Sequence, residues 1–99
     1  MPKSAFAANA QAKVCAIQIV RMLSELEIEP TTLANTCYSF VTENKAISVS
    51  GVYHNQGGVL ASVPGAGGIS PRQAPDDLLM REAVQARDWF ETITTETFL

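Results

Sequence analysis

The stretch "CYSFVTENKAISVSGVYH", residues 37–54, decides the fold of this chain. It holds two short runs rich in Val, Ile, Tyr and Phe, residues 37–43 and 46–54, with Asn44 and Lys45 between them. Such runs are typical of β-strands, and so short a link joins antiparallel neighbours. We therefore predict a β-hairpin, followed by a turn at "NQGG", residues 55–58, and a third strand at 59–63.

Side chains alternate between the two faces of the predicted middle strand. Ile47 and Val49 fall on one face, and Ser48 and Ser50 fall on the other. One face of the sheet is therefore expected to be wetter than the other.

Helical patterns lie on either side of this sheet. Alanine and other good helix formers, with apolar residues about a helical period apart, predict a first helix from about Phe6 to Leu26. Ile19, Val20 and Met22 widen its apolar stripe, so we expect this helix to be more buried than most. A second long helix is predicted over residues 74–98, with Asp76 and Asp77 at its start. Its expected packing stripe comprises Leu79, Ala83, Ala86, Phe90 and Ile93, with Leu78 and Trp89 beside it.

The connections between these elements are rich in turn residues. Residues 27–36, "EIEPTTLANT", and residues 64–75, "PGAGGISPRQAP", both read as connections. The second is not a dinucleotide-binding loop, because Ser70 stands where its last glycine should be and Pro71 prevents a helix there. The predicted fold is α+β, a small antiparallel meander sheet of about three strands packed between an N-terminal and a C-terminal helix.

Composition excludes several classes of function. A formal net charge of −3 with scattered Lys and Arg argues against binding nucleic acid. No apolar run approaches the ~20 residues that span a bilayer, and no signal peptide is recognisable. The two cysteines, Cys15 and Cys37, lack the spacing of a metal site with His54. A low charged fraction of 17% suggests that part of the surface meets a partner.

Six segments in order resemble one family. They are "PKSAFAANAQAKV", "LANTCYSF", "ISVSGVYH", "SVPGAGGISP", "APDDLLMREA" and "WFETITTETF". Read together, they resemble the C-terminal part of the flavoprotein subunit of flavocytochrome c sulfide dehydrogenase. The resemblance implies that residues 1–28 are the terminal helix of a FAD-binding domain and residues 29–99 a C-terminal domain. It also implies a fragment that does not retain FAD and is inactive by itself, because it lacks the glycine fingerprint that holds the pyrophosphate.

The resemblance gives Cys37 a role in redox chemistry. In the family, the cysteine of "NTCYS" is one half of a redox-active disulfide beside the flavin, and its partner lies in the N-terminal part of the protein. Hydrosulfide would attack that disulfide, and electrons would leave through FAD to a c-type cytochrome subunit. This sulfur-oxidising family works in the periplasm, so the resemblance implies that location.

Further flavin contacts are implied at Lys3, Ser4, Thr36 and Trp89. Lys3 and Ser4 belong to the "PKS" motif, whose following helix N-terminus faces the flavin and stabilises negative charge on the reduced ring. The chain departs from the commoner family pattern with Ala5 and Ala12 in place of glycine. Close backbone approach to the flavin at Ala5 is therefore in question.

Plainer interpretations stand beside these. Without the resemblance, Cys37 reads as a small buried apolar residue, Trp89 as core packing and Lys3 as a solvated charge. We expect Cys15, among apolar helix residues, to be structural, and His54 to be a surface or capping residue. No nucleophile elbow precedes a serine, which excludes a hydrolase triad. The alternative to a redox domain is a non-catalytic docking or dimerisation module, and in either case we expect the isolated chain to self-associate.

Overall fold

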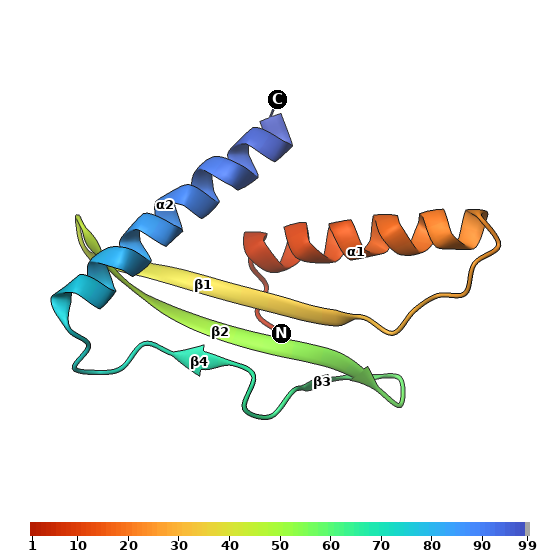
Figure 1. Cartoon of the computed structure of the whole chain (residues 1–99), viewed down its shortest axis with the longest axis horizontal. Coiled ribbons are helices and arrows are strands. Elements are labelled where there is room, and N and C mark those ends of the chain that lie inside the picture. The colour runs from red at the N-terminus through yellow and green to blue at the C-terminus, as the bar shows by residue number, and fades with distance from the viewer. Residues whose placement is uncertain (99) are drawn as a thin grey trace. The chain divides into compact units, whose positions relative to one another are not determined.

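The computed structural model describes residues 1–98 and has an α+β architecture (Figure 1). The predicted N-terminal helix, antiparallel sheet and C-terminal helix are confirmed. The elements in chain order are α1 (Ala5–Leu23), β1 (Thr32–Thr42), β2 (Lys45–Gln56), β3 (Val59–Ser62), β4 (Gly68–Ile69) and α2 (Asp76–Phe98).

The sheet has the strand order β1-β2-β3, and the two-residue strand β4 also pairs with β2. β2 and β3 are antiparallel, with Tyr53 opposite Ser62 and Gln56 opposite Val59. The tight turn between them uses Gly57 and Gly58, whose φ angles of +61° and +85° suit glycine. The predicted "NQGG" turn is therefore confirmed, and Asn55 Oδ1 stabilises it by accepting the Gly58 N–H at 2.8 Å.

The first predicted connection is wrong in its second half. Residues 32–36 form the beginning of β1 and not a loop. The side chains of Asn35 and Thr36 hydrogen bond to Ser4 and Ser50, respectively, and these bonds fix an extended backbone. Within the predicted loop 64–75, β4 was also unexpected; there the Ser70 N–H donates to the Ser48 carbonyl at 3.0 Å.

Helix α1 ends three residues earlier than the predicted limit at Leu26. Glu25 adopts a left-handed conformation with φ +59°, which no helix interior allows. The Leu26 N–H then donates to the Arg21 carbonyl at 2.9 Å and the Glu25 N–H to the Met22 carbonyl at 3.2 Å. This pair of bonds is a Schellman motif, in which the chain turns back and satisfies the last carbonyls of the helix.

The chain divides into two compact units. The first contains residues 1–36 and 50–67, and the second begins at Cys37, includes residues 37–49 and resumes at Gly68. The buried residues of the first are Ala7 and Asn35, while Ala46, Ala83 and Ala86 are buried in the second. These three buried residues of the second unit lie on β2 and α2, and side chains as small as alanine permit close packing of a helix on a strand.

Burial corrects two predictions about the helices. Among the residues of α1 only Ala7 is buried, and Ile17, Val20 and Leu23 are 59%, 61% and 81% exposed, so the expected deep burial of this helix is wrong. In α2, Phe90 is exposed and does not belong to the packing stripe. Ala83 and Ala86 face inward together with half-buried Trp89 and Ile93. Phe90 is rotated about 100° around the helix axis from Trp89, so its side chain leaves the inward face.

No helix within residues 1–98 combines the length and the apolar character that crossing a bilayer requires.

Candidate functional site

Two of the motifs singled out in the sequence meet in the first unit. Ser4, of "PKS", donates its hydroxyl hydrogen to Asn35 Oδ1, of "NTCYS", at 2.6 Å. Asn35 is only 2% exposed, although asparagine is usually a surface residue. The Ser4 oxygen also accepts the Ala7 N–H at 3.1 Å and so caps α1. One serine therefore begins the helix and ties its first turn to β1.

An open hollow of about 660 Å³ lies at this end of α1. Met1, Lys3 and Gln11 line it together with Ser4, Ala5 and Leu60 of β3. Helix N-termini carry a partial positive charge, which favours anions and electron-rich groups. Lys3 is exposed and adds a full positive charge to this hollow. Ala5, where the resemblance led us to expect glycine, is the first residue of the helix and also lines the hollow.

Thr36 also lies in the first unit, where its side chain is already engaged. Its hydroxyl lies 3.0 Å from the Ser50 hydroxyl of β2. Neighbouring residues of a strand point to opposite faces, so Asn35 and Thr36 face different sides of β1. The flavin contact predicted for Thr36 stays a prediction, and the hydroxyl would have to be shared with Ser50 to make it.

The second unit holds Cys37, which the structure shows as a half-buried thiol. By the alternation of β1, Cys37 points to the same face of this strand as Asn35, and Tyr38 points to the other. Cys15, which we expected to be structural, is by contrast an exposed thiol on α1. The exposure follows from the exposed position of most of α1.

Trp89 of the second unit lies on the inward side of α2 and is half-buried. It follows Ala86 by three residues and continues the stripe formed by Ala83 and Ala86. This position suits packing inside the second unit. The role of Trp89 beside a flavin stays a prediction.

A polar cluster of the second unit was not predicted from the sequence. Ser48 Oγ donates to Glu82 Oε1 at 3.1 Å, and Ser70 Oγ donates to Glu82 Oε2 at 2.6 Å. The Ser48 N–H donates to Ser70 Oγ at 2.8 Å. We call Ser48, Ser70 and Glu82 the carboxylate clamp. One signal existed in the sequence: Glu82 stands between Leu79 and Ala86 at helical spacing, so an acidic residue interrupts the apolar stripe.

The charge of Glu82 in this clamp affects the ionisation of Tyr38. Burial, and secondarily the negative charge of Glu82, raise the pKa of the Tyr38 phenol above the value near 10 of a free tyrosine. Both effects disfavour the phenolate. The polar face of β2 thus turns inward in this unit, since Ser48 is half-buried while Ile47 and Val49 of the opposite face are exposed.

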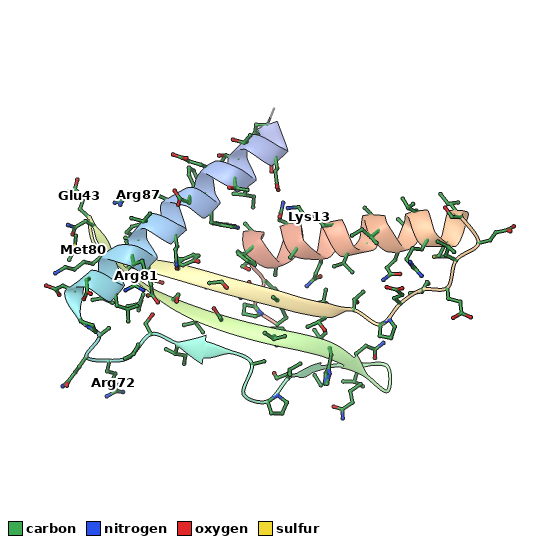
Figure 2. All side chains as sticks on the ribbon, in the orientation of Figure 1. Lys13, Glu43, Arg72, Met80, Arg81 and Arg87 are labelled. Carbon is green, nitrogen blue, oxygen red and sulfur yellow. The ribbon has the colours of Figure 1, made fainter. Side chains whose placement is uncertain are left out.

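Charged contacts attach α2 to the β1–β2 hairpin at two further points of the second unit. Figure 2 shows Arg87 of α2 beside Glu43 of the hairpin turn, where the guanidinium donates to the Glu43 carbonyl. The same guanidinium lies 5.1 Å from the ring centroid of Phe40, a cation–π contact. Lys45 Nζ lies 3.1 Å from Asp76 Oδ1 at the start of α2.

The family of the chain follows from its sequence match. A family model described as flavocytochrome c sulphide dehydrogenase, flavin-binding, matches residues 29–98. The chain belongs to this family. The suspected resemblance is thereby confirmed, and the match includes β1 to β4 and α2. The flavocytochrome c sulphide dehydrogenase name implies a flavoprotein oxidoreductase with a cytochrome partner in the full-length enzyme; the boundary predicted between residues 28 and 29 as a domain limit stays a prediction.

The residues at the start of α1, which precede the segment matched by the flavocytochrome c sulphide dehydrogenase model, fit one part of a flavin. A capped helix N-terminus with Lys3 beside it suits the electron-rich edge of the ring system. The chain has no G-x-G-x-x-G segment to hold a pyrophosphate, since Ser70 ends the nearest approximation at residues 65–70. These residues therefore suit contact with the flavin ring.

Proposed function

We propose that this chain is the C-terminal part of a FAD-dependent sulfide dehydrogenase, with Cys37 as one half of a redox-active disulfide. The observation that carries the proposal is the hydrogen bond between Ser4 and Asn35, two residues before Cys37. It ties the helix N-terminus expected at the flavin to the strand that carries the cysteine. The family match over residues 29–98 supports the same assignment.

The chemistry of Cys37 in the longer protein is a thiol–disulfide exchange. Hydrosulfide attacks one sulfur of the disulfide, so that a new sulfur–sulfur bond forms and the other cysteine leaves as a thiolate. Bound FAD would supply an acceptor for the electron pair released by sulfide and a source of single electrons for a haem subunit. Cys37 is half-buried, so only part of its side chain is open to an attacking group.

The remaining residues would bind and orient. Lys3 and the N-terminus of α1 would stabilise negative charge at the edge of the flavin ring, where Ser4 fixes the direction of the helix. Thr36 and Trp89 would line the flavin side. The proposal includes a c-type cytochrome as partner, a periplasmic location, and loss of FAD from the chain when it stands alone.

The test is to co-express residues 1–99 with the flavin-binding N-terminal region of a family member and purify the complex without reductant. Flavin absorbance measures cofactor retention, and mass spectrometry of unreduced peptides maps the disulfide. We expect Cys37 to be bridged to a cysteine of the added region, and Cys15→Ser to leave that bridge intact. A complex that retains flavin while Cys37 is recovered as a thiol would overturn the redox assignment.

A second candidate, a docking or dimerisation module, is favoured by the exposed apolar side chains of α1. Ile17, Val20 and Leu23 are each more than half exposed, which is costly for an isolated helix in water. The two candidates are compatible, because a domain separated from its neighbours can self-associate through surfaces that they would cover.

A further inference from the structure

Helix α2 carries a carboxylate that no part of the proposed chemistry uses, in the same compact unit as Cys37 and Tyr38. Glu82 accepts hydrogen bonds from the hydroxyls of Ser48 and Ser70 on its two oxygens, at 3.1 and 2.6 Å. Hydrogen bonds to a charged acceptor are about twice as strong as neutral ones. All three residues belong to the second compact unit, and each is half-buried.

The clamp connects three elements that are distant in sequence. Ser48 belongs to β2, Ser70 directly follows β4, and Glu82 lies on α2. Backbone bonds strengthen the connection, because the Ser70 N–H donates to the Ser48 carbonyl and the Ser48 N–H donates to Ser70 Oγ. Ser70 is therefore at once a donor to Glu82 and an acceptor from β2. Removing this single hydroxyl would remove the hydrogen bond that links Glu82 of α2 to the residue after β4.

We propose that Glu82, held by Ser48 and Ser70, is a positioning residue for the Cys37–Tyr38 segment of β1. The inference rests on the proposed role of Cys37 for its biological meaning. Its physical content is separate: the clamp fixes β4 on β2, the strand that is hydrogen bonded to β1, and holds one negative charge that acts on the Tyr38 phenol. Loss of the clamp loosens the strands next to Cys37 and removes that charge.

Tyr38 provides a spectroscopic readout that a merely structural role would not move. The chain has two tyrosines, so Tyr53→Phe leaves Tyr38 as the single phenol whose ionisation changes the ultraviolet absorbance. In this background, Glu82→Gln should lower the pKa of Tyr38 part of the way toward its ordinary value, since burial still acts on it. Glu91→Gln, the same change at an exposed position of α2, should leave the Tyr38 titration where it was.

Hydrogen exchange and thiol modification test whether loss of the clamp loosens the strands next to Cys37. Ser70→Ala should speed exchange of the Ser48 amide by about tenfold or more, because its acceptor is gone. In a Cys15→Ser background, the same variant should raise the rate at which Ellman's reagent modifies Cys37 severalfold. Ser70→Thr keeps a hydroxyl, so its amide exchange and Cys37 modification rates should match those of the wild type. Ser39→Ala, at an exposed position of β1, should change neither rate.

The proposal is overturned if Glu82→Gln leaves the Tyr38 titration unchanged. It is also overturned if Ser70→Ala alters Cys37 reactivity only as much as its loss of global stability in urea requires, or if Ser70→Thr does not restore the wild-type rates. These experiments use the 99-residue chain without flavin. A failure of the redox assignment, seen as a Cys37 thiol in the longer protein, would leave their outcome unchanged.

Discussion

At the scale of single residues, Tyr38 links stability to alkaline pH. Its raised pKa means that the folded protein keeps the phenol proton at a pH where the unfolded chain has lost it. The unfolded state then binds fewer protons, so the free energy of unfolding falls as pH rises from about 10 through the pKa of the folded state. Below that range the Tyr38 proton is bound in both the folded and the unfolded state, so Tyr38 contributes no pH dependence to the free energy of unfolding.

We expect this loss to disappear in Tyr38→Phe. Urea unfolding at several pH values between 8 and 11, compared for wild type and variant, measures the difference, which should grow with pH above about 10. Tyr53→Phe, which removes the other phenol of the chain, is measured in parallel to show whether the effect is particular to Tyr38. Parallel curves for wild type and Tyr38→Phe would contradict the linkage.

Glycine at position 67 is required by a close backbone approach. A Cβ there would stand 2.5 Å from the Ser50 carbonyl oxygen, well inside contact distance. Gly67→Ala should therefore cost about 1–3 kcal/mol of unfolding free energy, as overpacking against backbone does. Gly68→Ala is the matched control, since nothing lies within 4 Å of its Cβ position, and it should be nearly neutral. Thermal or urea unfolding measures both variants. Equal stability of Gly67→Ala and Gly68→Ala would contradict the prediction, because it would mean that the backbone at residue 67 moves away from Ser50 at no cost.

At the scale of elements, the start of α1 depends on Ser4. Ser4→Ala removes both the cap on the Ala7 N–H and the donor to buried Asn35, and we expect a loss of about 2 kcal/mol. Ser4→Thr retains a hydroxyl and should lose much less. Chemical denaturation followed by far-ultraviolet circular dichroism measures both. An unchanged midpoint for Ser4→Ala would remove the structural support for the contact between the two motifs.

The elements also show which local signals are reliable. The Gly57–Gly58 turn was predicted correctly, and α2 begins two residues after the predicted limit at residue 74, because acidic first-turn residues and paired glycines act within a few residues of themselves. The end of α1 was not predicted. Glu25 in a left-handed conformation carries no sequence signal, since glycine is the usual residue there.

At the scale of the whole molecule, the exposed apolar residues of α1 predict self-association of the isolated chain. Val20 and Leu23 are 61% and 81% exposed, and replacing both by serine should shift the chain toward the monomer. Val84→Ser, at a similarly exposed apolar residue of α2, is the matched control and should have less effect. Sedimentation velocity over a range of concentrations measures the distribution. A wild-type chain that stays monomeric at high concentration would contradict the prediction.

Several candidate site residues were proposed from sequence because they lie in short motifs. "PKS" and "NTCYS" drew attention to Ser4, Lys3, Thr36 and Cys37, and the bond from Ser4 to Asn35 joins these motifs in the first unit. The clamp could not be found in this way. Its three residues come from positions 48, 70 and 82 and have no common motif, so only the pairing of β4 with β2 and the packing of α2 bring them together.

The sequence by itself determined the element types and the family of this chain. Periodicity, turn residues and local capping depend on neighbours a few positions apart, and the family match reads the same linear order. The tertiary structure alone decided which faces are buried. It left Ile47, Phe90 and most of α1 exposed, because burial depends on the surfaces that distant segments offer. It turned Ser48 inward, because the half-buried Glu82 carboxylate accepts a hydrogen bond from a hydroxyl and could not accept one from an apolar side chain.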